Sequence, residues 1–233
     1  MERLPILTNR LLKSLSSANR KLLLSRCTLV ELEHRMVISE AGSSPSHAYF
    51  MTSGMASEVV TLANGEVVEI GLVGYEGVTG SYHLLGPSRS LSQCFIQVAG
   101  QAYELPFPEL QGFFDESSDV RRAILKYIQH QLAHLGQTAA CNRVHDAGPR
   151  FARWLLTAQD RSSAEEFSLT QDFLAQMLGT GRTTISIISK MFERRGFVGH
   201  SRSRIRILDR IGLEAIACSC YEAMRGTLVE LYG

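Results

Sequence analysis

The chain has 233 residues, of which 24 are lysine or arginine and 23 are aspartate or glutamate, so its formal net charge is +1. Its 45% hydrophobic and 20% charged residues can build real cores, which excludes a disordered chain. No stretch approaches the roughly 20 apolar residues of a membrane span, and the N-terminus lacks the features of a secretory signal. Five scattered cysteines fit a reducing compartment. We therefore expect a cytoplasmic protein with no membrane association, of one large domain or two ordinary ones.

The near-neutral total conceals a separation of charge along the chain. Residues 181–210 contain eight basic residues and two acidic ones, a local charge of +6, whereas the remainder carries −5. A basic block at one end of an acidic chain indicates a polyanionic partner at that end.

The N-terminal part is predicted to begin with a helical segment and to continue as strands. Leucines recur at helical spacing through residues 4–25. From Cys27 to Phe107, short runs rich in Val, Ile, Phe and Tyr alternate with turn residues. Asn64-Gly65 lies between two alternating apolar runs, which is a strong signal for a hairpin. Many short, closely spaced strands predict an antiparallel barrel or sandwich.

The period becomes helical between Asp119 and about Asn142. Apolar residues there recur at alternating spacings of three and four, which is the seam of a coiled coil over nearly three heptads. A two-stranded dimer is one interpretation, and a helix packed on its own domain is the other. The candidate dimerisation residues are Leu125, Ile128, Leu132, Leu135, Ala139 and Asn142.

A domain boundary is predicted after this helix. Gly148-Pro149 interrupts the helical pattern. Beyond it we expect a short apolar helix over residues 150–158, which contains the single tryptophan, Trp154, and then a polar linker over residues 159–167.

The segment from Thr170 to Arg195 has the packing pattern of a helix-turn-helix. Thr170 can cap a first helix, and the small Ala175 allows the second helix to approach closely. Gly179 tolerates the left-handed backbone of a tight turn. Ile185 and Ile188 can anchor the second helix on the core. These positions together predict a DNA-binding unit.

The exposed face of the second helix, over residues 182–192, is the candidate reading surface. Arginine and threonine near its N-terminus can reach base edges, and the lysine and arginine further along can reach phosphates. The alternation in residues 195–209 predicts a β-hairpin wing whose arginines face the DNA backbone. The candidate DNA-binding residues are Thr170, Gln171, Arg182, Thr183, Ser186, Ile187, Lys190, Arg194, Arg202 and Arg204. The tail from Ile211 to Tyr232 is predicted as one further helix.

The order of these parts resembles the Crp/Fnr family of bacterial transcription regulators. The strongest local match is LTQDFLAQMLGTGRTTISIISKMFERRGFV, and GSSPSHAYFMTSG and LVGYEGVTG are similar to the strand–glycine turns of the family's β-roll. The resemblance implies an α+β fold: an antiparallel, jelly-roll-like β-roll over residues 1–118, a dimerisation helix and hinge over 119–147, and a winged helix-turn-helix over 148–233. It also implies a homodimer that binds double-stranded DNA and contacts RNA polymerase.

The resemblance leaves the effector unknown. Family members that bind cyclic AMP use a Glu after a Gly and an Arg followed by Ser or Thr. Alignment of the following strand places Ser90 at the arginine position, so we do not expect cyclic AMP as the effector, although a loop shift could restore Arg89. The candidate pocket residues are Gly74, Glu76, Gly77, Arg89 and Ser90. Cys27 alone cannot hold the iron–sulfur cluster of the family's oxygen sensors, which needs four thiolates.

Other chemistry-bearing residues favour no catalytic site. His130 and His134 lie one helical turn apart but off the seam, and we predict two partly solvated side chains. Cys218 and Cys220 are predicted to be packed thiols, with a redox or metal role as the alternative. We find no nucleophile–base set and expect no enzyme, no cofactor and no metal. The rival to a DNA-binding regulator is a ligand sensor that signals through protein contacts and has a vestigial DNA-binding domain.

Overall fold

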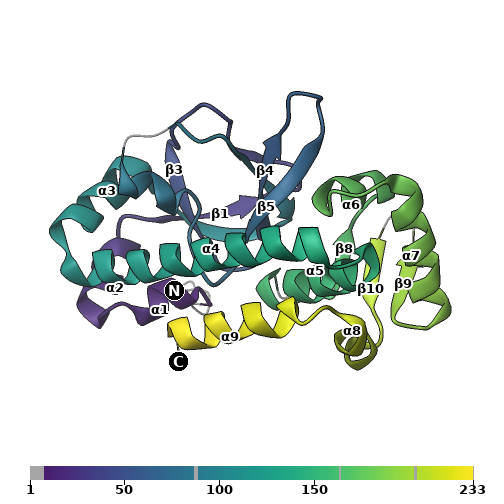
Figure 1. The fold of residues 1–233 in the computed structure, drawn as a ribbon. Helices are drawn as coiled ribbons and strands as arrows, with labels where there is room; N and C mark the ends of the chain where they lie inside the picture. Colours follow the sequence, from purple (N-terminus) through teal and green to yellow (C-terminus); the bar gives the residue numbers. More distant parts are fainter. Residues whose placement is uncertain (1–7, 87–88, 163, 202–203, 233) are drawn as a thin grey trace.

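The structure is a computed structural model that describes the chain except for residues 1–7, 87–88, 163, 202–203 and 233 (Figure 1). Strands dominate the N-terminal half, a long helix crosses the middle, and a helical domain with a small sheet follows, so the fold is α+β. Within the described ranges, none of the helices combines the length and apolarity that crossing a bilayer requires.

The predicted N-terminal helical segment consists of two short helices, α1 (Arg10–Ser14) and α2 (Ser17–Leu24). Asn9 caps α1 by accepting a hydrogen bond from the backbone N–H of Leu12 at 2.9 Å. Ser16 caps α2 in the same way, accepting from the N–H of Asn19 at 3.3 Å. The cap at Ser16 starts a new helix and explains why the leucine pattern is interrupted there.

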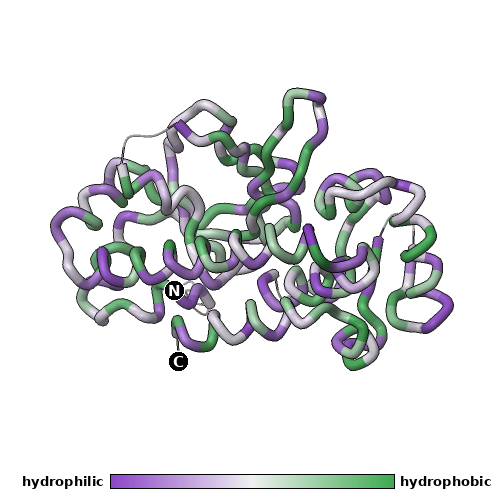
Figure 2. Tube along the Cα trace, viewed as in Figure 1, coloured by the Kyte–Doolittle hydropathy of each residue, from purple (hydrophilic) through white to green (hydrophobic). Residues whose placement is uncertain are grey.

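The β-roll contains two antiparallel sheets. The first has the strand order β1 (Thr28–Leu32), β7 (Gly100–Pro106), β3 (His47–Met51). The second has the order β2 (Val37–Ser39), β6 (Gln93–Val98), β4 (Met55–Thr61), β5 (Val67–Val73). The predicted hairpin is confirmed, since β4 pairs with β5 and Gly65 has a φ of +83° in the connecting turn. Hydrophobic stretches run along both strands of this hairpin (Figure 2).

Two helical elements of this region were not predicted. The 3-10 helix η1 (Ser81–Leu85) follows β5, and α3 (Phe107–Glu116) follows β7. In α3 the buried residues are Phe107, Leu110 and Phe114, which fall on one face. The helix follows β7 without an intervening loop, so its apolar residues extend the aromatic-rich pattern of the strand and gave no separate signal.

The long helix α4 (Ser118–Val144) matches the predicted range within two residues at each end. Ser117 caps it by accepting from the N–H of Val120 at 3.4 Å. One face of α4 packs on the β-roll side of the protein, with Val120, Ile124 and Tyr127 fully buried. This helix therefore connects the β-roll to the C-terminal domain (Figure 1).

The predicted boundary and linker are wrong in detail. Helix α5 (Ala147–Ser162) includes Gly148 and Pro149 in its first turn and extends beyond residue 158, so the break falls at residues 145–146. Part of the expected linker is the strand β8 (Glu166–Ser168). The polar residues at the end of α5 are not solvated: Arg161 and Ser162 are 6% and 3% exposed. The polar composition of this segment predicts a solvated linker, because the residues that bury Arg161 and Ser162 are distant in the sequence.

The C-terminal domain contains α6 (Gln171–Met177), α7 (Arg182–Arg194) and a sheet of order β8, β10 (Arg204–Ile207), β9 (Val198–Ser201). The predicted single tail helix is instead two, α8 (Arg210–Ile216) and α9 (Cys220–Tyr232). Helix α9 runs back beside α4 toward the β-roll (Figure 1).

One hydrophobic cluster joins the C-terminal domain to the β-roll. Trp154 and Ile185, at 1% and 0% exposure, belong to the same cluster as Met55, Val59 and Leu72 of the second sheet. The Trp154 indole N–H also donates to Glu69 Oε1 at 2.8 Å. The two parts therefore share a core across the predicted boundary.

Candidate nucleic-acid interface

The helix-turn-helix is formed by α6 and α7, and its packing positions are occupied as predicted. Thr170 Oγ1 accepts from the N–H of Phe173 at 3.1 Å and caps α6. Gly179 lies in the turn with a φ of +54°, the left-handed region that favours glycine. Ala175 and Ile185 are 9% and 0% exposed, and Ile188 is partly buried against the same core.

The opposite face of α7 is open to solvent. Arg182, Thr183, Lys190 and Arg194 are exposed. Ile187 is 65% exposed, although it is a large apolar residue. An uncovered isoleucine among basic and hydroxyl side chains suits a base edge, because an apolar side chain can contact the thymine methyl group.

The remaining candidates on this unit are less exposed or lie on α6. Ser186 and Gln171 are half-buried, and Thr170 is exposed besides serving as a cap. Arg182 Nε lies 3.2 Å from Asp172 Oδ1, and both side chains are more than 60% exposed. An ion pair at this exposure is worth little, so Asp172 leaves Arg182 free to exchange partners.

The predicted wing is a hairpin of β9 and β10. In β10, Ile205 is 1% exposed while Arg204 and Arg206 are exposed, which is the predicted alternation. Arg204 Nη1 lies 3.4 Å from Glu166 Oε2 of the neighbouring strand β8. Arg202 lies outside the described residues. The wing therefore presents arginines on the face opposite its hydrophobic core.

One arginine of the basic block serves the fold instead. Arg210 Nη2 lies 2.7 Å from Asp160 Oδ1, and its Nε lies 2.9 Å from Glu214 Oε1. The Tyr221 hydroxyl accepts from Arg210 at 2.6 Å and donates to Asp160 at 2.7 Å. Arg210 therefore joins α5, α8 and α9. Among the described lysines and arginines of the basic block, the exposed ones are Arg182, Lys190, Arg194, Arg195, Arg204 and Arg206.

The predicted seam on α4 is largely uncovered. Leu125 and Leu132 are 42% and 60% exposed, Ala139 and Asn142 are exposed, and Leu135 is half-buried. Ile128 is the exception at 4% exposure, because it packs in the core beneath the helix. Helix α4 thus packs on its own domain through one face and leaves a separate apolar stripe in solvent.

A cavity of about 410 Å³ lies between the second sheet and α4. Three of the predicted pocket residues line it, namely Glu76, Arg89 and Ser90. The other two shape the turn beneath it. A Cβ atom at Gly74 would lie 2.3 Å from the Arg161 carbonyl oxygen, and one at Gly77 would lie 1.9 Å from Tyr127 Cζ. These glycines allow the turn to pack against α5 and α4.

Of the two residues that would hold a cyclic nucleotide, Glu76 is paired with another side chain and Arg89 is exposed. Glu76 is 1% exposed, and its Oε1 lies 3.4 Å from Arg161 Nη1. Ser90 is buried, with its Oγ 2.8 Å from Ser92 Oγ, whereas Arg89 is exposed. Glu76 therefore neutralises Arg161 of α5, a contact that no local pattern of residues indicates.

His130 and His134 lie on α4 at the wall of the cavity, and the prediction that they are partly solvated is wrong. His130 and His134 are 5% and 7% exposed, not partly solvated. Burial, together with the charge of Arg161, lowers the pKa of His130 to about 4 and that of His134 well below its usual value, so both rings are neutral at pH 7. On the opposite wall, burial raises the pKa of Glu58 to about 7. The cavity is weakly charged.

Comparison with known proteins agrees with this geometry. Residues 149–216, which contain α6, α7 and the wing, match the Crp-like helix-turn-helix domain. The C-terminal part of the chain is therefore a Crp-like helix-turn-helix domain. The transcriptional activator protein FnrA of Stutzerimonas stutzeri is 26% identical over 127 residues, which span 52% of each chain, so the match covers about half the length of this relative.

Solved structures of Crp/Fnr regulators share the whole fold. A crp/fnr-family regulator from Eubacterium rectale superposes with a TM-score of 0.68 at 17% identity, covering 88% of this chain and 96% of the other. FixK2 from Bradyrhizobium japonicum has a TM-score of 0.68 at 16% identity, covering 83% and 98%. The β-roll, long helix and helix-turn-helix domain therefore follow one another as in the Crp/Fnr fold.

Proposed function

We propose that this protein is a sequence-specific DNA-binding transcription regulator that acts as a homodimer. The observation that carries the proposal is the exposed face of α7, where Arg182, Thr183, Ile187 and Lys190 lie together in solvent, opposite the fully buried Ile185. Such a face on a capped helix-turn-helix fits the major groove. This face of α7 does not form a catalytic site, and we propose that the protein is not an enzyme. We also propose that it acts in the cytoplasm, where the DNA is.

In this proposal each part of the interface has its own role. Arg182 and Thr183 read base edges, and Ile187 contacts a thymine methyl. Lys190, Arg194 and Arg204 bind phosphates and set the register, assisted by Arg202, Thr170 and Gln171. Two subunits joined along α4 place their α7 helices about one turn of duplex apart. RNA polymerase is the proposed protein partner on the promoter.

The cavity between the β-roll and α4 is the proposed effector site. Its wall is formed by α4, the helix that carries the exposed dimer stripe, so a bound molecule would alter the packing of that helix. Leu72, Ile128 and Leu132 give it an apolar lining, and both histidines are neutral. These features suit a small, largely apolar ligand better than cyclic AMP, because Glu76 is already paired with Arg161 and Arg89 lines the cavity from an exposed position.

Selection from random duplexes followed by sequencing tests the DNA-binding function. We expect a palindromic site whose base preference relaxes in Arg182→Ala by about 1–3 kcal/mol at the contacted base pair. Arg204→Ala should weaken binding to all DNA sequences alike and reduce the slope of log affinity against log salt concentration by about one. Arg26→Ala, an exposed arginine on the β-roll side, is the control. If no duplex is retained, the protein is instead a sensor with a vestigial DNA-binding domain.

The dimer is tested separately at the stripe on α4. Leu132→Glu introduces a charge at a position that is 60% exposed in the single chain, so the fold should survive while self-association is weakened at least tenfold. Sedimentation at several concentrations measures the change. Ile211→Glu, at an 80% exposed position on α8 of the C-terminal domain, is the matched control. Equal association of both variants and the wild type would contradict an α4 seam.

A further inference from the structure

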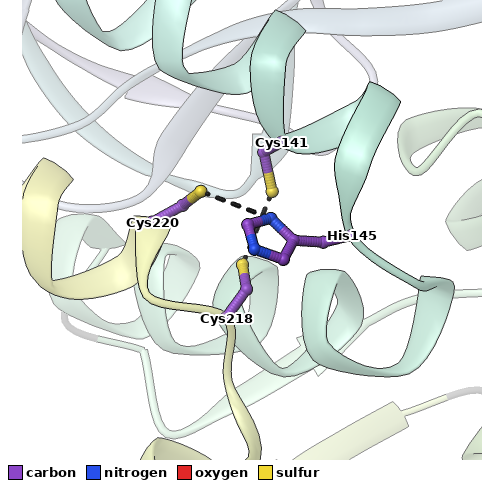
Figure 3. A group of neighbouring side chains, drawn as sticks. All are labelled: Cys141, His145, Cys218 and Cys220. Atoms are coloured by element: carbon purple, nitrogen blue, oxygen red, sulfur yellow. Dashed lines mark hydrogen bonds between the residues drawn. The ribbon is translucent and has the colours of Figure 1, made fainter.

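Four side chains that are distant in sequence converge at the C-terminal end of α4. Cys141 and His145 come from the last turn of α4 and its cap, Cys218 from the α8–α9 loop, and Cys220 from the start of α9. Their sulfur and nitrogen atoms all lie within 4.8 Å of one another, and the side chains point toward a common centre (Figure 3). The three thiols are free and buried.

We propose that these residues bind one divalent transition-metal ion, and that this ion is Zn²⁺. A Cys₃His set is one of the usual structural zinc sites, in which zinc lies about 2.3 Å from sulfur and about 2.0 Å from nitrogen. Tetrahedral ligands at those distances are about 3.5–3.8 Å apart. Cys141 Sγ lies 3.4 Å from Cys218 Sγ, and Cys220 Sγ lies 3.6 Å from His145 Nδ1, so little movement is needed.

The charges around the cluster support a bound ion. Zinc with three thiolates and a neutral imidazole has a net charge of −1. Arg150 and Arg153, at 7% and 5% exposure, are buried beside it, and within the described part of the chain neither forms an ion pair. Both Nε atoms lack a hydrogen-bond partner there. Asp146 acts on Arg150 and Glu69 on Arg153 only from beyond ion-pair distance, and the anionic metal–thiolate complex would supply both buried cations with a further counter-charge.

A neighbouring side chain also suits a metal–thiolate site. Gln137 Nε2 donates to Cys220 Sγ at 3.0 Å. Groups that donate to a ligand atom orient it and tune the metal site. Gln137 lies one turn before Cys141 on α4, and His145 lies one turn after it, so three residues of one helix face contribute to the same centre.

The compactness of the cluster distinguishes a single ion from other thiol chemistry. A four-iron cluster holds its thiolates on separate irons around a cube, which is wider than this set of atoms. Cys141 and Cys218 are unbonded, since a disulfide requires about 2.05 Å between sulfurs. Binding of Zn²⁺ releases the three thiol protons to solvent without any change of oxidation state. The ion would fasten the end of α4 to the segment that joins α8 and α9.

Metal content of the full-length protein, purified under reducing conditions, tests the site. We expect about one zinc per chain, and Co²⁺ exchanged into the site should give the visible absorption of tetrahedral cobalt thiolate. The double variant Cys218→Ser/Cys220→Ser should lose at least nine-tenths of the metal. Cys27→Ser, which removes a half-buried thiol elsewhere, should retain it.

Gln137→Ala keeps all four ligands and guards against loss of metal through misfolding. It should bind Zn²⁺ about 10–100-fold more weakly in competition with a chromogenic chelator, while the chain remains folded. Metal-free wild-type protein that takes up neither Zn²⁺ nor Co²⁺ would overturn the proposal. So would iron with acid-labile sulfide, a Cys141–Cys218 disulfide in the purified protein, or full zinc content in the double variant.

Discussion

The outer face of α7 and the cavity beneath α4 both carry polar side chains suited to a partner, but they are built in opposite ways. On α7 the polar residues are exposed, and their positions follow from the helical period alone. In the cavity they are buried, and Glu76 is held by Arg161, which lies 85 positions later in the chain. A surface made by one helix can be altered without loss of stability, whereas a site assembled from distant elements cannot.

The largest effect is expected at the buried ion pair. Glu76→Gln leaves the Arg161 guanidinium without its counter-charge at a site where both side chains are below 10% exposure. Removal of one partner of a buried pair costs about 3–5 kcal/mol. Urea unfolding of the variant measures this loss, and Asp172→Asn, which breaks the exposed pair with Arg182, is the control with a change below about 0.5 kcal/mol. Equal losses of unfolding free energy in the two variants would contradict the difference between the buried cavity and the exposed surface of α7.

The same distinction holds within α7, between two isoleucines two positions apart. Ile185→Ala removes a fully buried side chain and should lower the free energy of unfolding by about 2–5 kcal/mol. Ile187→Ala, at a 65% exposed position, should change it by no more than about 0.5 kcal/mol while weakening binding to the selected DNA site. Chemical denaturation and a mobility-shift titration of both variants measure the two effects. A stability loss at Ile187 would show that the face is covered in the folded protein.

A smaller effect is expected from pH. Burial raises the pKa of Glu58 to about 7, from 4.5 in the unfolded chain. A raised folded-state pKa contributes stability that is fully present below pH 4.5 and is lost as the pH rises through about 7. The unfolding free energy should therefore fall less between pH 5 and pH 8 in Glu58→Gln than in the wild type, by on the order of 2–3 kcal/mol. Denaturation midpoints across that range measure it. Glu69, also buried with a pKa raised to about 7, adds a fall of the same sign, whereas the lowered pKa values of His130 and His134 add a rise below about pH 6.5 in both proteins.

What the sequence predicted well has a local cause. The Asn64-Gly65 hairpin, the long helix α4 and the turn at Gly179 each depend on residues within a few positions of one another. The alternation of Arg204, Ile205 and Arg206 gave the wing for the same reason. The turn at Gly179 and the wing belong to the unit that carries the proposed DNA contacts, so most of that surface could be located without a structure.

What the sequence did not predict depends on partners far along the chain. His130 was placed in solvent because the seam residues gave the only periodic signal on α4, and nothing local showed that α9 covers this face, where Thr227 Oγ1 lies 3.1 Å from His130 Nδ1. Cys218 and Cys220 lie 77 and 79 positions after Cys141, and their convergence with it depends on the segment between α8 and α9. The sequence offers two local signals, the Cys218-x-Cys220 pair and the four-residue spacing of Cys141 and His145, but nothing that joins them.

The return of α9 along α4 has a consequence for the order in which the protein is completed. Tyr232 donates a hydrogen bond to the backbone carbonyl oxygen of Glu76, at the turn below the cavity. Ribosomes make the β-roll and α4 first, and domains fold in the order of their synthesis. The nascent β-roll must therefore wait with an uncovered helix face until α9 has emerged, and the cavity acquires its final shape only after the DNA-binding domain has been synthesised.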